Sequence, residues 1–320
     1  MPFLDTPRLR IHYQEAGTGP QVFVLVHGNF ASWRWWKPIL ERLPKGWRAL
    51  ALDLRGCGES SGGELDESGS TYDIPQLADD LAGFADLLHL DAFHLVGHSL
   101  GGAVALQYAL HHQPRLRSLT LAAPPPATGL VGMRSGASAF AGLLGGMDPN
   151  HRPSMAALRS SYRLHRALGT NRLMLRRALP EMMPAAALDP AVAESLLADA
   201  ARLSSDTVVG FLQALHRWNV EAELPGLRIP TLILWGAKDI VVPRAGLEQL
   251  ARLLPLADLL VWSDTGHSPQ LERPDRFVAS LAVSIRNSRR KRLRRLLRRT
   301  LDWCAAAISL RSIIANVHDS

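Results

Sequence analysis

Residues 92–107 read AFHLVGHSLGGAVALQ, and this stretch decides the fold. An apolar segment at residues 93–96 runs into the pentapeptide at residues 97–101, and the small residues that follow are typical of a tightly packed helix. A serine at the centre of such a pentapeptide, between a strand and a helix, is typical of a nucleophile elbow. We therefore predict that the Ser99 hydroxyl lies at the carboxyl end of a strand, beside a helix N-terminus that favours negative charge.

The composition indicates a globular protein with a large core. The chain has 320 residues, of which 47% are hydrophobic and 20% charged, which is enough apolar surface for folding and excludes disorder as a whole. Two cysteines, Cys57 and Cys304, are too few for a disulfide framework, and Asp5 and Arg8 stand where a signal peptide would have its apolar core. No apolar run reaches the roughly 18 residues that a membrane span needs. We therefore expect a cytoplasmic protein.

The positive charge is concentrated at the C-terminus. Of the 36 Lys and Arg residues, ten follow Ile285, against only two acidic residues, so the preceding chain is close to neutral. Apolar residues at 293, 296, 297, 301, 304 and 308 recur at helical spacing among these cations, which predicts a basic amphipathic helix over residues 289–308. Such a helix binds an anionic membrane surface or a partner, or remains a solvated extension. We expect no nucleic-acid partner, because the rest of the chain shows no basic, aromatic-bearing groove.

Strands and helices alternate along most of the chain, which predicts an α/β fold with a mostly parallel sheet. The expected strands are residues 8–15, 21–26, 48–54, 93–97, 116–122, 231–235 and 259–261. The expected helices between them include residues 35–43, 76–88, 101–111 and 244–253. The alternation stops at residues 124–224, where helices are expected at 155–168, 172–179, 191–202 and 207–218. We therefore predict a core of residues 1–123 and 225–285, a helical insertion at 124–224 and a basic tail at 286–320.

Five motifs, in this order along the chain, resemble those of the α/β-hydrolase family over about residues 8–285. They are VHGN at residues 26–29, DLRGCGES at 53–60, the elbow around Ser99, GAKD at 236–239 and DTGHS at 264–268. The resemblance implies an α/β-hydrolase sheet flanked by helices, with the helical insertion forming a cap over the active site.

A serine nucleophile needs a base and an acid. Serine is weakly nucleophilic at its free pKa, so Ser99 requires an imidazole within hydrogen-bond reach, and His267 lies on a loop at the same end of the predicted sheet. A carboxylate has to orient that imidazole, and Asp239, directly after the strand TLILWG, is the candidate. Asp264 is the alternative, although it lies only three residues from His267.

A third acidic residue has a structural interpretation. Asp53 follows a neighbouring strand, and we expect it, with Arg55 and Ser60, to hold the turn at residues 56–58.

The oxyanion hole follows from the resemblance. The family supplies two backbone N–H groups, one after the nucleophile and one after the early His-Gly pair. At the matching positions stand Leu100 and Asn29, whose side-chain amide could add a donor.

The substrate pocket is less defined by the sequence. Of three tryptophans after the oxyanion loop, at residues 33, 35 and 36, we place Trp33 in the pocket wall. His98 adjoins Ser99, and we interpret it as a packing residue that reaches the pocket edge. Six of the seven methionines fall in the predicted insertion, which suits an adaptable apolar surface. No Gly-Lys-Ser/Thr phosphate loop and no zinc-type histidine spacing is present, so we expect neither a metal nor a cofactor.

These observations predict a serine hydrolase that forms an acyl-enzyme with a small, largely apolar ester, thioester or lactone. A carbon–carbon bond hydrolase of the same fold and a ligand-binding receptor of the same fold remain the alternatives, since an intact triad does not distinguish them.

Overall fold

The computed structural model describes residues 2–62, 70–132, 155–185 and 190–288. The predicted basic helix at 289–308, and with it the membrane contact expected there, lies outside these residues. Among the described residues, no helix is long and apolar enough to cross a membrane.

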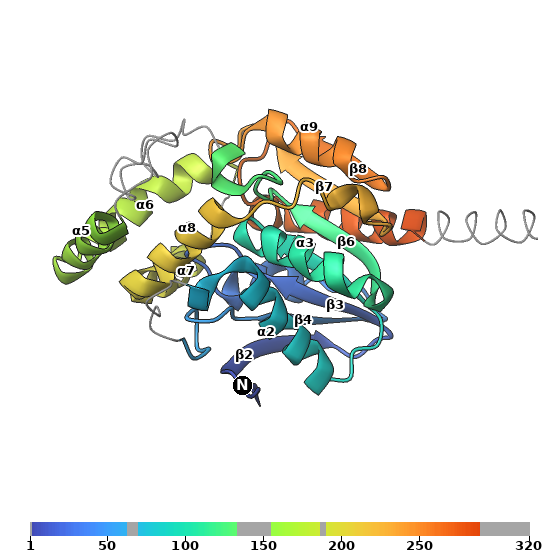
Figure 1. The fold of residues 1–320 in the computed structure, drawn as a ribbon, viewed down its shortest axis with the longest axis horizontal. Helices are drawn as coiled ribbons and strands as arrows, with labels where there is room; N and C mark the ends of the chain where they lie inside the picture. Colours follow the sequence, from blue (N-terminus) through green and yellow to red (C-terminus); the bar gives the residue numbers. More distant parts are fainter. Residues whose placement is uncertain (1, 63–69, 133–154, 186–189, 289–320) are drawn as a thin grey trace, which may run out of the picture.

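An eight-stranded sheet forms the centre of the molecule (Figure 1). Its order is β1-β2-β4-β3-β5-β6-β7-β8. Strand β2 pairs antiparallel with β1 and with β4, and all other neighbours are parallel, as the sequence predicts. The strands are β1 Phe3–Asp5, β2 Arg10–Gly17, β3 Gln21–Val26, β4 Trp47–Leu52, β5 Phe93–His98, β6 Leu116–Ala122, β7 Thr231–Gly236 and β8 Ala257–Trp262. Within the described residues, the short edge strand β1 is the one strand that the sequence analysis did not predict.

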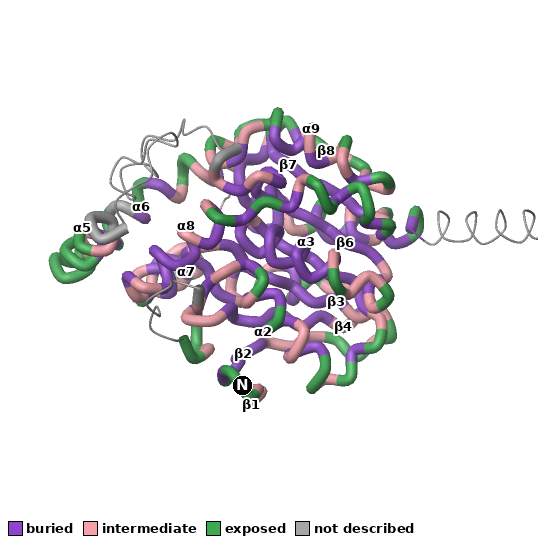
Figure 2. Tube along the Cα trace, in the orientation of Figure 1, coloured by how far each residue is buried: buried purple, intermediate pink, exposed green. Residues whose placement is uncertain are grey.

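The sheet separates two apolar cores, because successive side chains of a strand point to opposite faces. Val24 and Val26 of β3 join the larger core, whereas Phe23 and Leu25 of the same strand join the smaller one. The central strands are accordingly buried along most of their length (Figure 2). Continuous burial on both faces is typical of a parallel sheet covered by helices.

Helices cover both faces of the sheet. The larger core contains side chains of α2 Ile74–Leu87, α3 Leu100–His112 and α9 Arg244–Leu253. The smaller core contains side chains of α1 Lys37–Leu40 and of the helical residues 274–288. The short helix α10 Pro269–Glu272 comes directly before the latter.

The helix predicted at residues 35–43 is split. A 3-10 turn at Trp33–Trp36 precedes α1 Lys37–Leu40, with Pro38 in the first turn of α1. Proline has no backbone N–H to donate to a preceding turn, so a new helix begins there.

Between β6 and β7, the described residues form four α-helices, at positions close to those that the sequence pattern predicts. They are α5 Met155–Ala167, α6 Thr170–Met182, α7 Pro190–Arg202 and α8 Ser205–Arg217. We call them the inserted helices. Helix α8 contacts α2 and α3, whereas α5 and α6 extend away from the sheet (Figure 1). Helix α8 begins two residues earlier than predicted because the Ser204 hydroxyl caps it by accepting the Thr207 N–H at 3.0 Å.

Candidate active site

Ser99 lies in a strained turn between β5 and α3. Its backbone has φ 50° and ψ −122°, a conformation that favours glycine. The turn is fixed by the Ser99 N–H, which donates to the Ala122 carbonyl at 2.9 Å. Neighbouring glycines make the close crossing possible: a Cβ on Gly97 would lie 2.2 Å from the Gly101 oxygen, and one on Gly101 would lie 2.4 Å from the Val26 oxygen.

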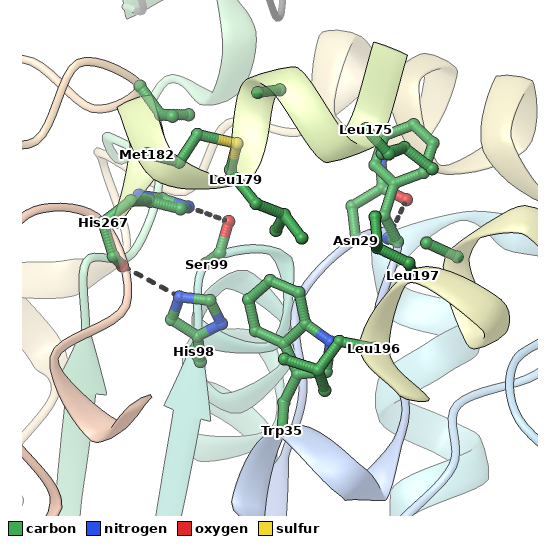
Figure 3. A pocket seen from close by; sticks show the side chains of 14 residues that line it. Asn29, Trp35, His98, Ser99, Leu175, Leu179, Met182, Leu196, Leu197 and His267 are labelled. Carbon is green, nitrogen blue, oxygen red and sulfur yellow. Dashed lines mark hydrogen bonds between the residues drawn. The ribbon is translucent and has the colours of Figure 1, made fainter. Parts of the chain in front are cut away.

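A continuous set of hydrogen bonds joins Ser99, His267 and Asp239. His267 Nε2 lies 3.1 Å from Ser99 Oγ, and His267 Nδ1 lies 2.9 Å from Asp239 Oδ2 (Figure 3 shows the first contact). An ionised carboxylate only accepts hydrogen bonds, so the proton resides on Nδ1 and leaves Nε2 to accept the serine hydroxyl. The Val241 and Val242 N–H groups donate to the other Asp239 oxygen at 2.7 and 3.0 Å.

The alternative acid lies elsewhere. Asp264 forms ion pairs with Arg273 and Arg276, each at 3.0 Å, on the outside of the loop. The structure therefore brings Asp239, and not Asp264, into contact with the His267 ring.

Asp53 is buried and has the expected structural role, but its partners differ in part from the predicted ones. Its carboxylate accepts the backbone N–H groups of Trp33 at 2.7 Å and Glu59 at 3.1 Å, and it contacts His12 Nδ1 at 2.7 Å. The Ser60 hydroxyl donates to the Asp53 carbonyl. The expected role of Arg55 is wrong: its guanidinium makes a two-point contact with Asp80 on α2.

His98 connects the elbow to the loop of His267. Its Nε2 lies 3.0 Å from the His267 carbonyl oxygen, so Nε2 carries the proton and donates (Figure 3). The ring is buried and stacks on Trp35, with centroids 5.7 Å apart. Burial holds the pKa of His98 well below 6.5, and the nearby His267 lowers it further. His98 is therefore a neutral positioning group in the wall of the site.

Glu272 fixes the His267 loop from the other side, a role that the sequence analysis missed. Its carboxylate accepts the N–H of Gly266 at 2.8 Å, of Ser268 at 3.1 Å and of Ala185 at 3.1 Å. Burial raises the pKa of this carboxyl, and the three N–H donors oppose that rise. The His267 N–H donates to the Met182 carbonyl at 2.8 Å, so the end of α6 is attached to the same loop.

The predicted oxyanion residues lie at the mouth of the elbow. Leu100 is the first residue of α3, where the helix itself supplies no acceptor for the N–H group. Asn29 follows β3 and lines the cavity beside Ser99. Its side-chain oxygen accepts the Phe30 N–H at 2.8 Å, which fixes the loop conformation.

A small cavity of about 50 Å³ opens beside Ser99. Leu175, Leu179 and Met182 of α6 and Leu196 and Leu197 of α7 form much of its wall (Figure 3). The remaining lining residues are Asn29, Phe30, Trp35, His98, Ser99, Ala178, Ala200, Val241 and His267.

The tryptophan of the cavity wall is Trp35, not the predicted Trp33. The Trp33 ring packs against the smaller core, with the Arg34 guanidinium 5.1 Å from its centroid. Its backbone N–H donates to Asp53, and its side chain is not part of the cavity lining. Among the described residues, no cluster of His, Cys, Asp or Glu is suited to hold a metal ion.

Comparison with known proteins identifies the family. The α/β-hydrolase fold family matches residues 21–274, and the chain belongs to it. A curated relative, the dihydrolipoyllysine-residue acetyltransferase component of the acetoin cleaving system of Cupriavidus necator, is 30% identical over 289 residues, which cover 87% of this chain and 67% of the relative. The 2-hydroxymuconate semialdehyde hydrolase of a Pseudomonas species is 27% identical over 276 residues, which cover 85% of this chain and 88% of that enzyme.

A solved structure shows the same architecture. A thermophilic esterase from Thermogutta terrifontis superposes with a TM-score of 0.68 at 25% identity, over 89% of this chain and 97% of that one. These comparisons confirm the predicted family and identify the chain as an enzyme of the α/β-hydrolase fold.

Proposed function

We propose that this protein is a serine hydrolase that cleaves a small, largely apolar ester, thioester or lactone through an acyl-enzyme. The observation that carries the proposal is the hydrogen-bonded series Asp239–His267–Ser99, which ends at an apolar cavity. The base contacts the nucleophile and the carboxylate orients the base, which is the geometry that nucleophilic catalysis by serine requires.

In the first half-reaction, Ser99 Oγ attacks the substrate carbonyl while His267 Nε2 takes the hydroxyl proton. The resulting oxyanion accepts hydrogen bonds from the backbone N–H groups of Leu100 and Asn29. The C–O or C–S bond then breaks, and the imidazolium gives its proton to the leaving alcohol or thiol. In a lactone the leaving oxygen stays attached to the acyl chain.

In the second half-reaction, water attacks the acyl group on Ser99. His267 takes a proton from this water and returns it to the serine as the carboxylic acid departs. Asp239 stabilises the imidazolium in both halves and remains ionised throughout.

The cavity lining favours a neutral substrate. Apolar side chains form most of the wall, and none of the described lining residues is Lys or Arg. A carboxylate entering this space would lose its hydration without gaining a cationic partner, which is unfavourable.

Carbon–carbon bond hydrolysis is the second candidate. The 27% identity over 276 residues to a 2-hydroxymuconate semialdehyde hydrolase favours it. The absence of a cation from the described cavity lining opposes it, because a muconate derivative carries a carboxylate. Comparing the two substrate classes on the same preparation decides between them.

Turnover of p-nitrophenyl butyrate tests the proposal. Wild-type protein should hydrolyse the ester, and Ser99→Ala should lower kcat by a factor of about 10³ or more, because the members of a triad act as a unit. Ser160→Ala, an exposed serine on α5, is the matched control and should keep full activity. Turnover that survives Ser99→Ala contradicts the proposal, whereas thermal stabilisation by esters without turnover supports the receptor alternative.

A further inference from the structure

A second hollow lies between α6 and α7, next to the catalytic cavity. It encloses about 390 Å³ and is open on one side. Apolar side chains form most of it, among them Pro180, Met183, Pro184 and Ala193. We call it the α6–α7 groove. Its two charged lining residues, Arg176 and Glu194, form an ion pair with each other at 2.9 Å and so leave the groove without a strong net charge.

Two leucines separate the groove from the catalytic cavity. Leu179 and Leu197 belong to the walls of both spaces, one from each helix. Their side chains form the partition, so a ligand that occupies both spaces requires a change in their rotamers. The inner space, of about 50 Å³, is much smaller than the groove of about 390 Å³.

We propose that the α6–α7 groove binds the distal part of a linear acyl chain whose carbonyl is held at Ser99. The proposal rests on the proposed ester or thioester hydrolysis and narrows the substrate to acyl groups of medium length. The apolar lining, the wall shared with the catalytic cavity at Leu179 and Leu197, and a volume within the roughly 300–1,000 Å³ of ordinary ligand sites all support an alkyl occupant.

A series of p-nitrophenyl esters from acetate to decanoate tests this site. Ala193→Trp places an indole in the groove without adding a cavity-lining residue, and it should lower the octanoate-to-acetate ratio of kcat/KM at least tenfold. Ala198→Trp is the matched control, because it lies on the same helix but lines neither space. Leu197→Ala should raise the relative rate for decanoate, whereas Leu175→Ala, which enlarges only the inner cavity, should not.

The outcomes separate this proposal from the proposed function. An octanoate-to-acetate ratio that is the same in wild type and Ala193→Trp overturns the groove assignment while Ser99-dependent hydrolysis stands. No hydrolysis of any ester, together with no reaction of Ser99 with a fluorophosphonate, overturns the proposed function itself. Melting temperatures of the variants establish that each is folded.

An independent feature lies on the outer face of α5 and α6. Residues 155–182, which form these helices and the turn between them, contain six Arg and a single acidic residue, Glu181. The three most exposed large apolar side chains of the described chain lie in the same segment, where Leu164, Leu168 and Leu173 are 58%, 65% and 50% exposed. Figure 2 shows this corner as an exposed projection from the sheet.

The cations of this segment outnumber the carboxylates that meet them. Arg159 and Arg163 share Asp206, and Arg172 and Arg176 share Glu194. Arg166 donates to a backbone carbonyl, that of Leu203, which leaves its charge unneutralised. At this corner, exposed apolar side chains therefore lie among guanidinium groups with an excess of positive charge.

We infer that the α5–α6 corner docks on an anionic lipid surface. Exposed leucines surrounded by arginines are the pattern of an interfacial helix, in which the apolar side chains enter the acyl boundary and the guanidinium groups meet the phosphates. A nucleic acid would meet the arginines through its phosphates but would offer no acyl layer for the three exposed leucines.

A fluorophore at the corner tests this surface in the full chain. An environment-sensitive dye on Leu168→Cys, with Cys304 replaced by Ser, should shift to the blue when vesicles of phosphatidylcholine and phosphatidylserine are added, and high salt should reverse the shift. The matched control carries the dye on Leu87→Cys, an exposed leucine of α2 outside the corner. Its emission should not change.

Three results would overturn the inference. One is vesicle binding with no change at residue 168, which assigns attachment to another part of the chain. Another is no vesicle binding at low salt. The third is a shift produced by a single-stranded oligonucleotide but not by vesicles, which assigns the corner to nucleic acid.

Discussion

At the scale of single residues, two aspartates next to the His267 region differ in what they contact. Asp239 follows β7 and faces the imidazole, whereas Asp264 follows β8 and faces two arginines. Asp239→Asn should lower kcat by about 10⁴ because the amide presents the wrong hydrogen-bond partner to the ring. Asp264→Asn should change kcat less than twofold. Steady-state hydrolysis of one soluble ester by both variants measures the difference, and a larger effect at Asp264 would contradict the assignment.

Ser99, His267 and Asp239 could be predicted because each stands in a short motif directly after a strand. Trp35 and Glu272 could not. Which of three adjacent tryptophans faces the cavity depends on the 3-10 turn at Trp33–Trp36, and the sequence pattern predicts an ordinary helix there. Glu272 lies four residues after the DTGHS motif, but its bonds to three backbone N–H groups depend on how the loop folds back.

At the scale of elements, the crossing of β5 and α3 depends on the absence of side chains. A Cβ on Gly101 would lie 2.4 Å from the Val26 carbonyl oxygen, so Gly101→Ala should lower the free energy of unfolding by about 1–3 kcal/mol. Gly83→Ala is the matched control within α2, where the nearest atom to the new Cβ would be Thr6 Cγ2 at 3.8 Å. It should raise stability by about 0.5–1 kcal/mol, since alanine is the better helix former.

Urea unfolding of both glycine variants checks this pair. A stable Gly101→Ala protein would show that the two backbones are farther apart than described.

The sequence predicts the boundaries of an element correctly where its hydrophobic pattern is strong. The prediction is wrong where local chemistry decides the boundary. The bounds of β3, β6 and α9 agree with the pattern. Helix α6 continues to Met182 through Pro180, although a proline favours ending the helix before it. The end of α6 is held by the Met182 carbonyl and His267, a contact between distant segments that no local pattern encodes.

At the scale of the whole molecule, the inserted helices are attached to both loops of the site. Asp199 of α7 accepts hydrogen bonds from Ser32 and Arg34 on the segment after the oxyanion loop, and α6 is bonded to the His267 loop. Movement of these helices would therefore change the active-site loops together with the access to Ser99.

Buried neutral histidines should make the free energy of unfolding depend on pH. Burial lowers the pKa of His98 and of His27 below 6.5, so the unfolded chain binds more protons below that pH. The free energy of unfolding should then fall as the pH drops below 6.5, by up to about 1.4 kcal/mol per pH unit for each group. His98→Gln should show a smaller decrease between pH 7.5 and 6 in urea titrations.

The range between pH 7.5 and 6 avoids the titration of two carboxyl groups whose effect on stability is opposite to that of the histidines. Burial raises the pKa of Asp80 and of Glu272 from 3.8 and 4.5, which favours the folded state as those carboxyls gain protons at lower pH. Equal pH slopes for wild type and His98→Gln would contradict the neutral, buried state of His98.

The central claim is that Ser99 is a nucleophile activated by His267, and covalent labelling tests it most directly. A fluorophosphonate should modify wild-type protein at a single peptide, with the phosphonyl group on Ser99 as located by mass spectrometry. His267→Ala should slow the labelling by orders of magnitude, because the serine loses its base. Labelling of Ser99→Ala at the wild-type rate, or modification of wild-type protein at a residue other than Ser99, would contradict the account.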